Sequence, residues 1–177
     1  MNIANKLTLL RMGMVPIFVL LRYLHLPFAL PISGIVFIIA SLTDMLDGHY
    51  ARKHHLITNF GKFADPLADK ILAASAMICL VDSGLIPAWS VIIIISREFA
   101  ITGFRIIAAS ENINIAAGPL GKLKTITQLI GLSLLLFYPL ISPGIGLFFY
   151  YFSVVMTVIS GIDYIVRNKK VLDLENI

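Results

Sequence analysis

The chain has 177 residues, of which 58% are hydrophobic and only 14% are charged, and its formal net charge is +4. An ordinary soluble domain has about 25% charged residues, so this composition excludes a typical water-soluble globule and favours an integral membrane protein. The positive charge then suits the anionic inner leaflet and anionic substrates, and we expect no nucleic acid as a partner.

Six apolar stretches take up nearly the whole chain, and each approaches the roughly 20 residues that cross a bilayer. A backbone exposed to lipid must satisfy its own hydrogen bonds, which favours helices. We therefore predict one domain, residues 1–177, with an all-α integral membrane fold: a bundle of six transmembrane helices. The predicted helices span residues 4–24, 30–53, 60–81, 86–109, 119–139 and 144–168.

Basic residues gather at one end of these predicted helices. If the N-terminus lies in the cytoplasm, nearly all of them fall on the inner half, with Arg22 at the outer end and Arg97 near mid-span. This asymmetry follows the positive-inside rule. We therefore expect a multi-pass protein of the inner or plasma membrane, with both termini and a polar site on the cytoplasmic side.

Four aspartates lie where the second predicted helix ends and the third begins. Asp44 and Asp47 are three residues apart, and Asp65 and Asp69 are four apart, so each pair shares a helix face. Their mutual repulsion near a membrane is costly. Two divalent cations would neutralise the four charges, and oxygen ligands favour Mg²⁺ or Mn²⁺. Zinc is disfavoured because no cysteine or suitably spaced histidine pair joins the group.

The neighbours of the aspartates suit a phosphate-bearing ligand. Gly48 and Ala51 share the stripe of the first aspartate pair and leave room for a bulky group to approach. Arg52 can meet remaining phosphate charge. Pro66 is best placed in the first turn of the third helix, which would set Asp65 at a positive helix end; an earlier start would place the proline inside the helix, where it should kink it.

The fourth and fifth predicted helices carry further charge, in the stretches SREFAITGFR and GPLGKLKTITQ. Arg97 and Glu98 near mid-span are costly unless they are paired or functional. Ion pairs within the bundle are an alternative explanation, above all for Glu98 and Lys124, and less so for Arg105 and Lys122.

Two other residues are expected to have structural roles. Asp163 lies four residues before Arg167, which is the spacing of an ion pair on one helix face. Cys79 stands alone in an apolar run, so we predict a buried packing residue.

Eight residues around the aspartates match the signature D..DG..AR........G...D...D at every fixed position. The chain therefore resembles the CDP-alcohol phosphatidyltransferase family, and the likeness extends to its six-span architecture. The resemblance implies transfer of a phosphatidyl group from CDP-diacylglycerol to an alcohol, with release of CMP. The matching residues are Asp44, Asp47, Gly48, Ala51, Arg52, Gly61, Asp65 and Asp69.

The resemblance also implies roles for these residues. Asp44, Asp47 and Asp65 would hold the metal ions, and Asp69 would be both a metal ligand and the base that takes the alcohol proton. In the first helix Asn5, Thr8 and Arg11 form an N..T..R pattern that is frequent in the family, although capping and anchoring also explain Asn5 and Arg11. The residues expected to bind CDP-diacylglycerol are Asn5, Thr8, Gly48, Ala51, Arg52 and Gly61.

The acceptor is not named by the signature. A basic pocket favours an anionic alcohol over serine or choline, and the stretches REF, TGFR and GKLKT..Q resemble the phosphatidylglycerophosphate synthase branch, whose acceptor is sn-glycerol 3-phosphate. Arg105 and Lys122 are the first candidates for binding its phosphate, followed by Arg97 and Lys62. Inositol phosphate, serine and phosphatidylglycerol remain alternative acceptors, and a homodimer is expected from the resemblance alone.

Two other functions use aspartates in membranes. Membrane prenyltransferases bind diphosphates through two aspartate-rich motifs far apart in sequence, whereas this chain has one compact cluster. A divalent-cation transporter would carry acidic residues near mid-membrane on several spans, whereas here they gather at one edge. Both alternatives are therefore less well supported than a phosphatidyltransferase.

Overall fold

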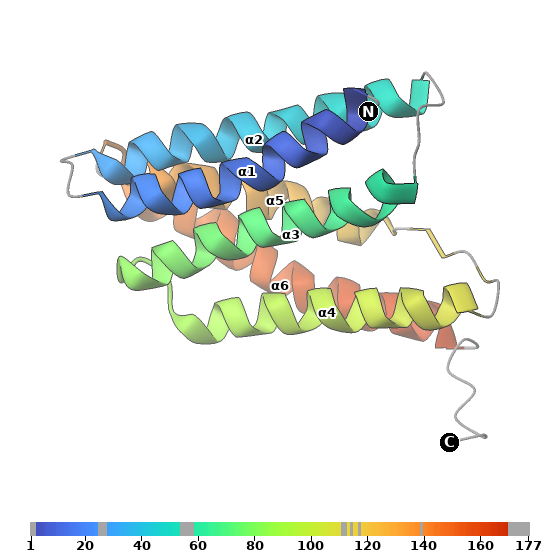
Figure 1. Ribbon diagram of the computed structural model, residues 1–177. Coiled ribbons are helices and arrows are strands. Elements are labelled where there is room, and N and C mark those ends of the chain that lie inside the picture. Colours follow the sequence, from blue (N-terminus) through green and yellow to red (C-terminus); the bar gives the residue numbers. More distant parts are fainter. Residues whose placement is uncertain are drawn as a thin grey trace. The chain divides into compact units, whose positions relative to one another are not determined.

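In the computed structural model, the described residues form six α-helices joined by turns and irregular segments, and no strand (Figure 1). It describes all residues except 1–2, 25–27, 54–58, 111–112, 114, 117, 139 and 170–177, and no side chains of residues 3–7, 44–53 and 59–63. The helices are α1 (Ile3–Tyr23), α2 (Ala29–Lys53), α3 (Asn59–Asp82), α4 (Ala88–Ser110), α5 (Pro119–Leu136) and α6 (Pro143–Arg167).

The six predicted helices are confirmed, and most of their ends agree within two residues. The largest difference is the end of α5, at Leu136 instead of residue 139. The backbone N–H groups of Phe137 and Tyr138 bond to the carbonyls three residues earlier, those of Leu134 and Leu135, at 3.2 and 3.1 Å. Such bonds tighten the last turn and close the helix.

The prediction that Pro66 lies in the first turn of its helix was wrong. Helix α3 begins at Asn59, so Pro66 and Asp65 lie well inside it. A proline inside a helix costs about 3 kcal/mol. Packing compensates for this cost, because Ala64, Ala68 and Leu72 form a fully buried stripe at a spacing of four residues.

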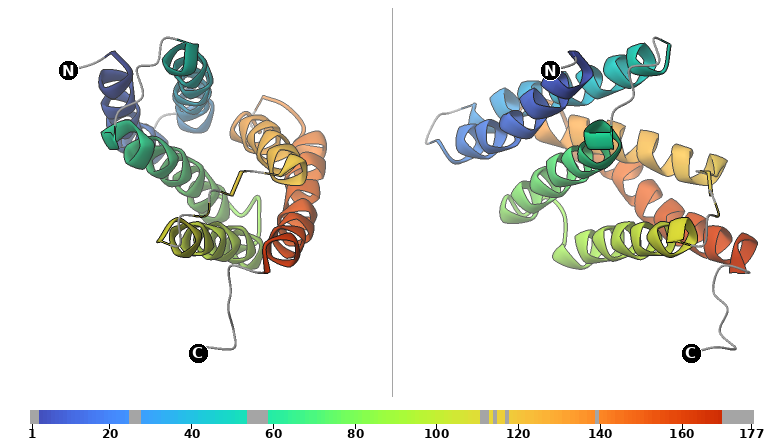
Figure 2. Two further views of the ribbon diagram at one scale, coloured as in Figure 1. Left: turned by 90° about the vertical axis from the view of Figure 1, so that its right-hand side faces the viewer. Right: turned by 45° about the vertical axis from the view of Figure 1, so that its right-hand side comes forward.

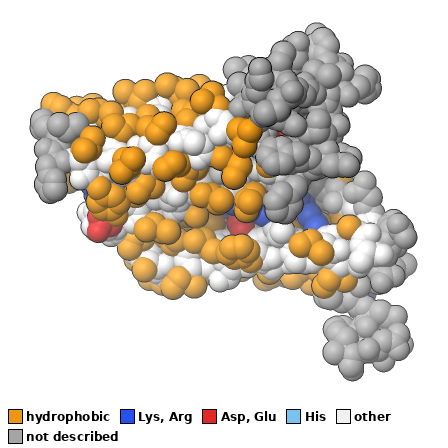
Figure 3. Space-filling model, viewed as in Figure 1, with side chains coloured by type: hydrophobic (Ala, Val, Ile, Leu, Met, Phe, Trp, Pro, Cys, Tyr) orange, Lys and Arg blue, Asp and Glu red, His pale blue; other side chains and the backbone are white. Residues whose placement is uncertain are grey.

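Membrane-spanning character is clearest in α6. Among the described residues, this helix alone is both long and apolar enough to cross a bilayer, while Ala29–Thr43 of α2 is a shorter apolar stretch. Helices α3 and α4 each carry charged residues within their length. On the face shown in Figure 3, hydrophobic side chains nonetheless cover much of the described surface.

The chain divides into two compact units. The first comprises Met1–Ile86 and Leu132–Pro143. In it α1 packs against both α2 and α3, and the Phe18 and Phe37 rings lie 6.2 Å apart in the α1–α2 core. Cys79 is buried, as predicted. Arg22 donates to the Ser83 hydroxyl at 2.7 Å and lies 3.7 Å from Asp82, so this arginine is bound at the C-terminal end of α3.

The second unit comprises Pro87–Gly131 and Gly144–Ile177. Helices α4 and α6 run side by side in it, as both views of Figure 2 show. Ser90 is hydrogen-bonded to Tyr150 at 2.7 Å, and further along both helices Arg105 bonds to Tyr164. Because the paired residue numbers rise together, the two helices are parallel.

The contact between α5 and α6 depends on Gly131. A Cβ atom at this position would lie 2.6 Å from the backbone nitrogen of Tyr150 and 2.9 Å from its Cα. Backbone atoms cannot move aside as a flexible side chain can. Only glycine therefore allows the two helices to approach this closely.

We expect Gly131→Ala to lower the stability of the purified protein by about 1 to 3 kcal/mol, the usual cost of overpacking. The measurement is the thermal unfolding midpoint in detergent. Gly103→Ala in α4 is the matched control, because a Cβ atom at Gly103 would have no neighbouring atom within 4 Å, and alanine is the better helix former there. Equal midpoints for the two variants would contradict the close approach of α5 and α6.

Candidate functional site

The aspartate pair of α3 faces α1 within the first unit. The Thr8 hydroxyl donates a hydrogen bond to Asp65 Oδ1, and Arg11 Nη1 lies 3.8 Å from Asp69 Oδ1. Asp65 and Asp69 therefore share one face of α3, as their spacing predicted. Thr8 and Arg11 are buried, whereas the Asp69 side chain is 46% exposed.

These contacts orient the carboxylates and leave them able to bind a cation. A carboxylate has about four acceptor positions, and the Thr8 hydroxyl occupies one of those on Asp65. Hydrogen bonds from neighbouring groups commonly hold metal-binding carboxylates in position. The donors are hard oxygens, which fit Mg²⁺ or Mn²⁺.

The other half of the predicted metal site lies outside the described side chains. Asp44 and Asp47 are in α2, whose backbone is described and which contacts α3. Among the described residues no group of three or more metal-binding side chains is found. Several residues predicted to bind substrate also lie outside the described side chains, so their assignments stay predictions: Asn5, Gly48, Ala51, Arg52, Gly61 and Lys62.

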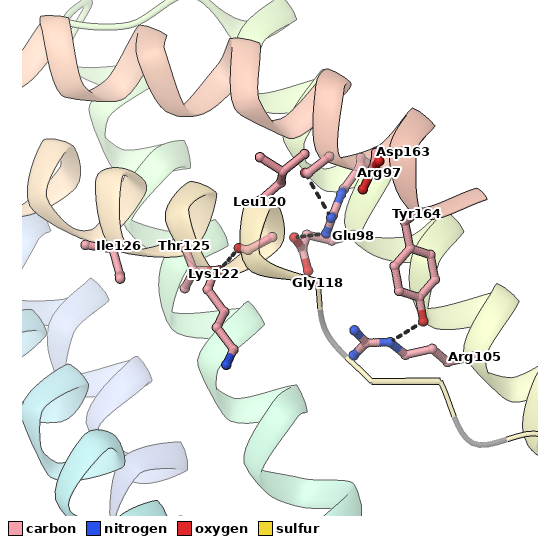
Figure 4. A pocket seen from close by; sticks show the side chains of 12 residues that line it. Arg97, Glu98, Arg105, Gly118, Leu120, Lys122, Thr125, Ile126, Asp163 and Tyr164 are labelled. Atoms are coloured by element: carbon pink, nitrogen blue, oxygen red, sulfur yellow. Dashed lines mark hydrogen bonds and ion pairs between the residues drawn. The ribbon is translucent and has the colours of Figure 1, made fainter. Parts of the chain in front are cut away.

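The second unit contains a pocket of about 430 Å³ (Figure 4). It is formed by α4, by α5 with the segment before it, and by α6. Three of the residues predicted to bind the acceptor phosphate line it together: Arg97, Arg105 and Lys122. The other lining residues are Glu98, Gly118, Leu120, Gly121, Thr125, Ile126, Ser160, Asp163 and Tyr164.

Glu98 lies between two of the cations near this pocket. It accepts hydrogen bonds from Arg97 Nη1 at 3.1 Å and from Lys124 Nζ at 2.7 Å. Lys124 is buried and Arg97 nearly so. Of the two explanations left open for Glu98 and Lys124, the structure favours ion pairing within the bundle, and the pairing also includes Arg97.

Arg97 crosses from α4 to α6 through a gap that glycine provides. Its Nη2 donates to Ser160 Oγ at 3.1 Å. A Cβ atom at Gly161 would lie 3.1 Å from Arg97 Cγ, and one at Gly121 would lie 3.7 Å from Nη2. The sequence did not indicate a role for Ser160 or Gly161. The one pattern that could have pointed to them is the recurrence of small residues on this face of α6, where Ser153 and Thr157 are also buried.

Arg105 is held by a residue that sequence analysis missed. Its Nε donates to the Tyr164 hydroxyl at 3.0 Å, and its Cζ lies 5.4 Å from the centre of the same ring. A tyrosine in an apolar helix is typical of a core residue, and nothing in the sequence indicates its partner 59 residues away.

Asp163 has two neighbours to consider. Its predicted ion pair with Arg167 is confirmed, with Arg167 Nε 2.7 Å from Asp163 Oδ1. Asp163 also lines the pocket, which the sequence did not indicate. The pocket thus has acidic groups on α4 and α6 beside its basic ones.

The sequence matches the family described as CDP-alcohol phosphatidyltransferase over residues 1–159. It is 44% identical to the "CDP-diacylglycerol--glycerol-3-phosphate 3-phosphatidyltransferase" of Bacillus subtilis (strain 168), over 99% of both chains. A protein of the same name from Rickettsia bellii is 33% identical over 96% of both chains. The "Probable phosphatidylglycerophosphate synthase" of Mycobacterium tuberculosis (strain ATCC 25618 / H37Rv) is 37% identical over 94% of this chain and 81% of its own.

Glu98→Gln should destabilise the protein, because it removes the carboxylate charge that two largely buried cations share. We expect a loss of about 2 kcal/mol or more and a corresponding fall in the thermal unfolding midpoint. Asp163→Asn is the matched acid-to-amide control, since its partner Arg167 is exposed and an exposed pair contributes about 1 kcal/mol or less. The same midpoint for Glu98→Gln and wild type would contradict this assignment.

Proposed function

Because the chain belongs to the CDP-alcohol phosphatidyltransferase family, we propose that it transfers the phosphatidyl group from CDP-diacylglycerol to sn-glycerol 3-phosphate. The products are phosphatidylglycerophosphate and CMP. The observation that carries this proposal is the 44% identity over 99% of both chains to a relative named for that activity. The basic pocket of the second unit supports it independently, since it suits a phosphorylated acceptor.

The donor substrate is assigned to the aspartate motif of the first unit. Asp44, Asp47, Asp65 and Asp69 would hold two Mg²⁺ or Mn²⁺ ions. When bound, such ions stabilise charge on the diphosphate and make a nearby hydroxyl more acidic. The side chains expected to bind CDP-diacylglycerol are those of Asn5, Thr8, Ala51 and Arg52, with Gly48 and Gly61 leaving room for it.

Asp69 is assigned the role of base. Its carboxylate would accept the proton of the acceptor hydroxyl as that oxygen attacks the phosphorus bearing diacylglycerol and CMP leaves. One observation supports the choice of Asp69: its side chain is 46% exposed and therefore accessible to a substrate.

The acceptor phosphate is assigned to Arg105 and Lys122, with Arg97 and Lys62 as further cations. A pocket of about 430 Å³ is within the usual range for small-molecule sites, roughly 300 to 1,000 Å³. Glu98 already neutralises much of the charge of Arg97 and Lys124. No ion pair joins Arg105 or Lys122 to another described residue, which supports their assignment to the ligand.

The proposal includes a six-span membrane topology with the site and both termini in the cytoplasm. The inward bias of Lys and Arg supports it. Large hydrophobic side chains also project from every helix, as lipid-facing residues would. One exposed example from each helix in turn is Leu20, Ile39, Ile78, Ile92, Ile130 and Phe148. A homodimer is proposed from family resemblance only.

The acceptor assignment predicts that the purified protein releases CMP from CDP-diacylglycerol with glycerol 3-phosphate and a divalent cation. Serine, inositol phosphate and phosphatidylglycerol should each give much slower release, and a strong chelator should stop the reaction. The assay measures CMP for each acceptor and each metal. A preference for one of the other acceptors would contradict the proposed substrate, while undiminished release in chelator would contradict the metal site.

Asp69→Asn should abolish transfer, because an amide cannot take the acceptor proton, but should keep much of the nucleotide binding. The two readouts are CMP release and equilibrium binding of CDP-diacylglycerol. Asp82→Asn is the matched control, since Asp82 pairs with Arg22 at the other end of α3, and it should retain activity. Substantial transfer by the Asp69→Asn variant would remove Asp69 from the role of base.

A further inference from the structure

Arg105 has an unusually defined orientation for an exposed arginine. Long basic side chains at a protein surface normally sample many rotamers, and fixing one costs conformational entropy. Here the guanidinium is fixed by Tyr164 in two ways, through the hydrogen bond from Nε and through the face of the ring. Among the described residues, the hydrogen bond and the ring contact that fix this orientation come from one neighbour on another helix.

Tyr164 is itself held firmly. The residue is only 6% exposed, and it forms a hydrophobic cluster with Ile101 and Phe104 of α4, against which Ile115 packs. The ring of Phe104 meets it edge to face, at 5.8 Å between centres and 75° between planes. Because the ring cannot turn freely, its hydroxyl has a fixed position beside the pocket.

The hydrogen bond to Tyr164 occupies one of the three guanidinium nitrogens of Arg105, Nε. Guanidinium groups bind phosphate most strongly through two parallel N–H groups. With Nε occupied by Tyr164, the two terminal nitrogens form the remaining edge, which lies on the far side of the guanidinium from the Tyr164 hydroxyl (Figure 4). This edge belongs to a residue that lines the pocket, as Lys122 does.

We propose that Tyr164 is a positioning residue: it orients Arg105 so that the two terminal nitrogens bind the acceptor phosphate. The inference rests on the proposed function, which assigns that phosphate to Arg105. Tyr164 touches neither substrate in this scheme. Its contribution is that Arg105 need not be ordered when the phosphate binds, so part of the entropic cost of binding is met in advance.

The first test is Tyr164→Phe, which removes the hydroxyl and keeps the ring. We expect the KM for glycerol 3-phosphate to rise about threefold to tenfold, which corresponds to the net contribution of one ordinary hydrogen bond. The kcat and the KM for CDP-diacylglycerol should change by less than about twofold, because binding of the acceptor is the property affected.

The matched control is Tyr150→Phe on the same helix. Tyr150 is fully buried, and its hydroxyl also makes a hydrogen bond to α4, with Ser90 at 2.7 Å, but it does not line the pocket. Both variants lose one interhelical hydrogen bond. If Tyr164 were only structural, the two should lower the unfolding midpoint alike and leave the KM for glycerol 3-phosphate unchanged.

A double-mutant cycle with Arg105→Lys shows whether Tyr164 acts through Arg105. Lysine keeps the charge but lacks the planar group that the tyrosine orients. In that background Tyr164→Phe should raise the KM for glycerol 3-phosphate by less than about twofold. Phe104→Leu provides an independent variant: it loosens the Tyr164 ring without altering the hydroxyl, and it should raise the same KM by a smaller factor.

The outcomes separate this inference from the proposed function. If wild-type protein transfers to glycerol 3-phosphate but neither Tyr164→Phe nor Phe104→Leu raises the KM, the positioning role is overturned and the function stands. A full effect of Tyr164→Phe in the Arg105→Lys background would overturn it as well. If the wild type does not use glycerol 3-phosphate, the proposed function fails and the inference fails with it.

Discussion

The structure depends on one constraint: a charged side chain inside an apolar helix bundle needs a partner. In the first unit Arg11 lies beside Asp69, and Arg22 lies between Ser83 and Asp82. Both arginines are on α1 and both partners are at α3, so each pair joins segments that are distant in the sequence. Ionic and hydrogen-bonded contacts between parallel helices therefore fix their relative register, which apolar packing alone specifies less strictly.

In the second unit, the basic side chains differ in the kind of partner that they have, and this difference separates structural cations from a candidate binding residue. Glu98 provides a carboxylate for both Arg97 and Lys124, so these cations stabilise the bundle. Among the residues that the structure describes, Arg105 is contacted by a neutral hydroxyl and an aromatic face, both from Tyr164, and by no carboxylate in an ion pair. A cation that is held in place without being neutralised keeps its attraction for an anion, which is the property expected of a binding residue.

Sequence reasoning succeeded where the signal is local. Apolar length and turn residues gave the six helices, and spacings of four residues gave the shared face of Asp65 and Asp69 and the ion pair of Asp163 with Arg167. Recognition of the family followed from a compact motif for the same reason, since all of its residues lie within 26 consecutive positions.

Prediction from the sequence failed where contacts between segments far apart in the chain determine the structure. The preference of proline for a first turn placed Pro66 wrongly, although the predicted span of 60–81 already began ahead of it; the burial of Ala64 and Ala68 outweighs that local preference. The partnership of Tyr164 with Arg105 spans 59 residues, and the gap at Gly161 is visible only once the side chain of Arg97 is placed against it. In these cases the sequence shows which type of residue is present, but it does not indicate which other residue that side chain contacts.

The parallel pairing of α4 and α6 has a mechanical consequence. Three hydrogen bonds connect the two helices at successive points along their length: Ser90 with Tyr150, Arg97 with Ser160, and Arg105 with Tyr164. Sliding one helix past the other by a single turn, about 5.4 Å, would break all three together. The α4 and α6 walls of the pocket are therefore held in one register over the length of both helices, while α5 and the segment before it form the rest of the lining.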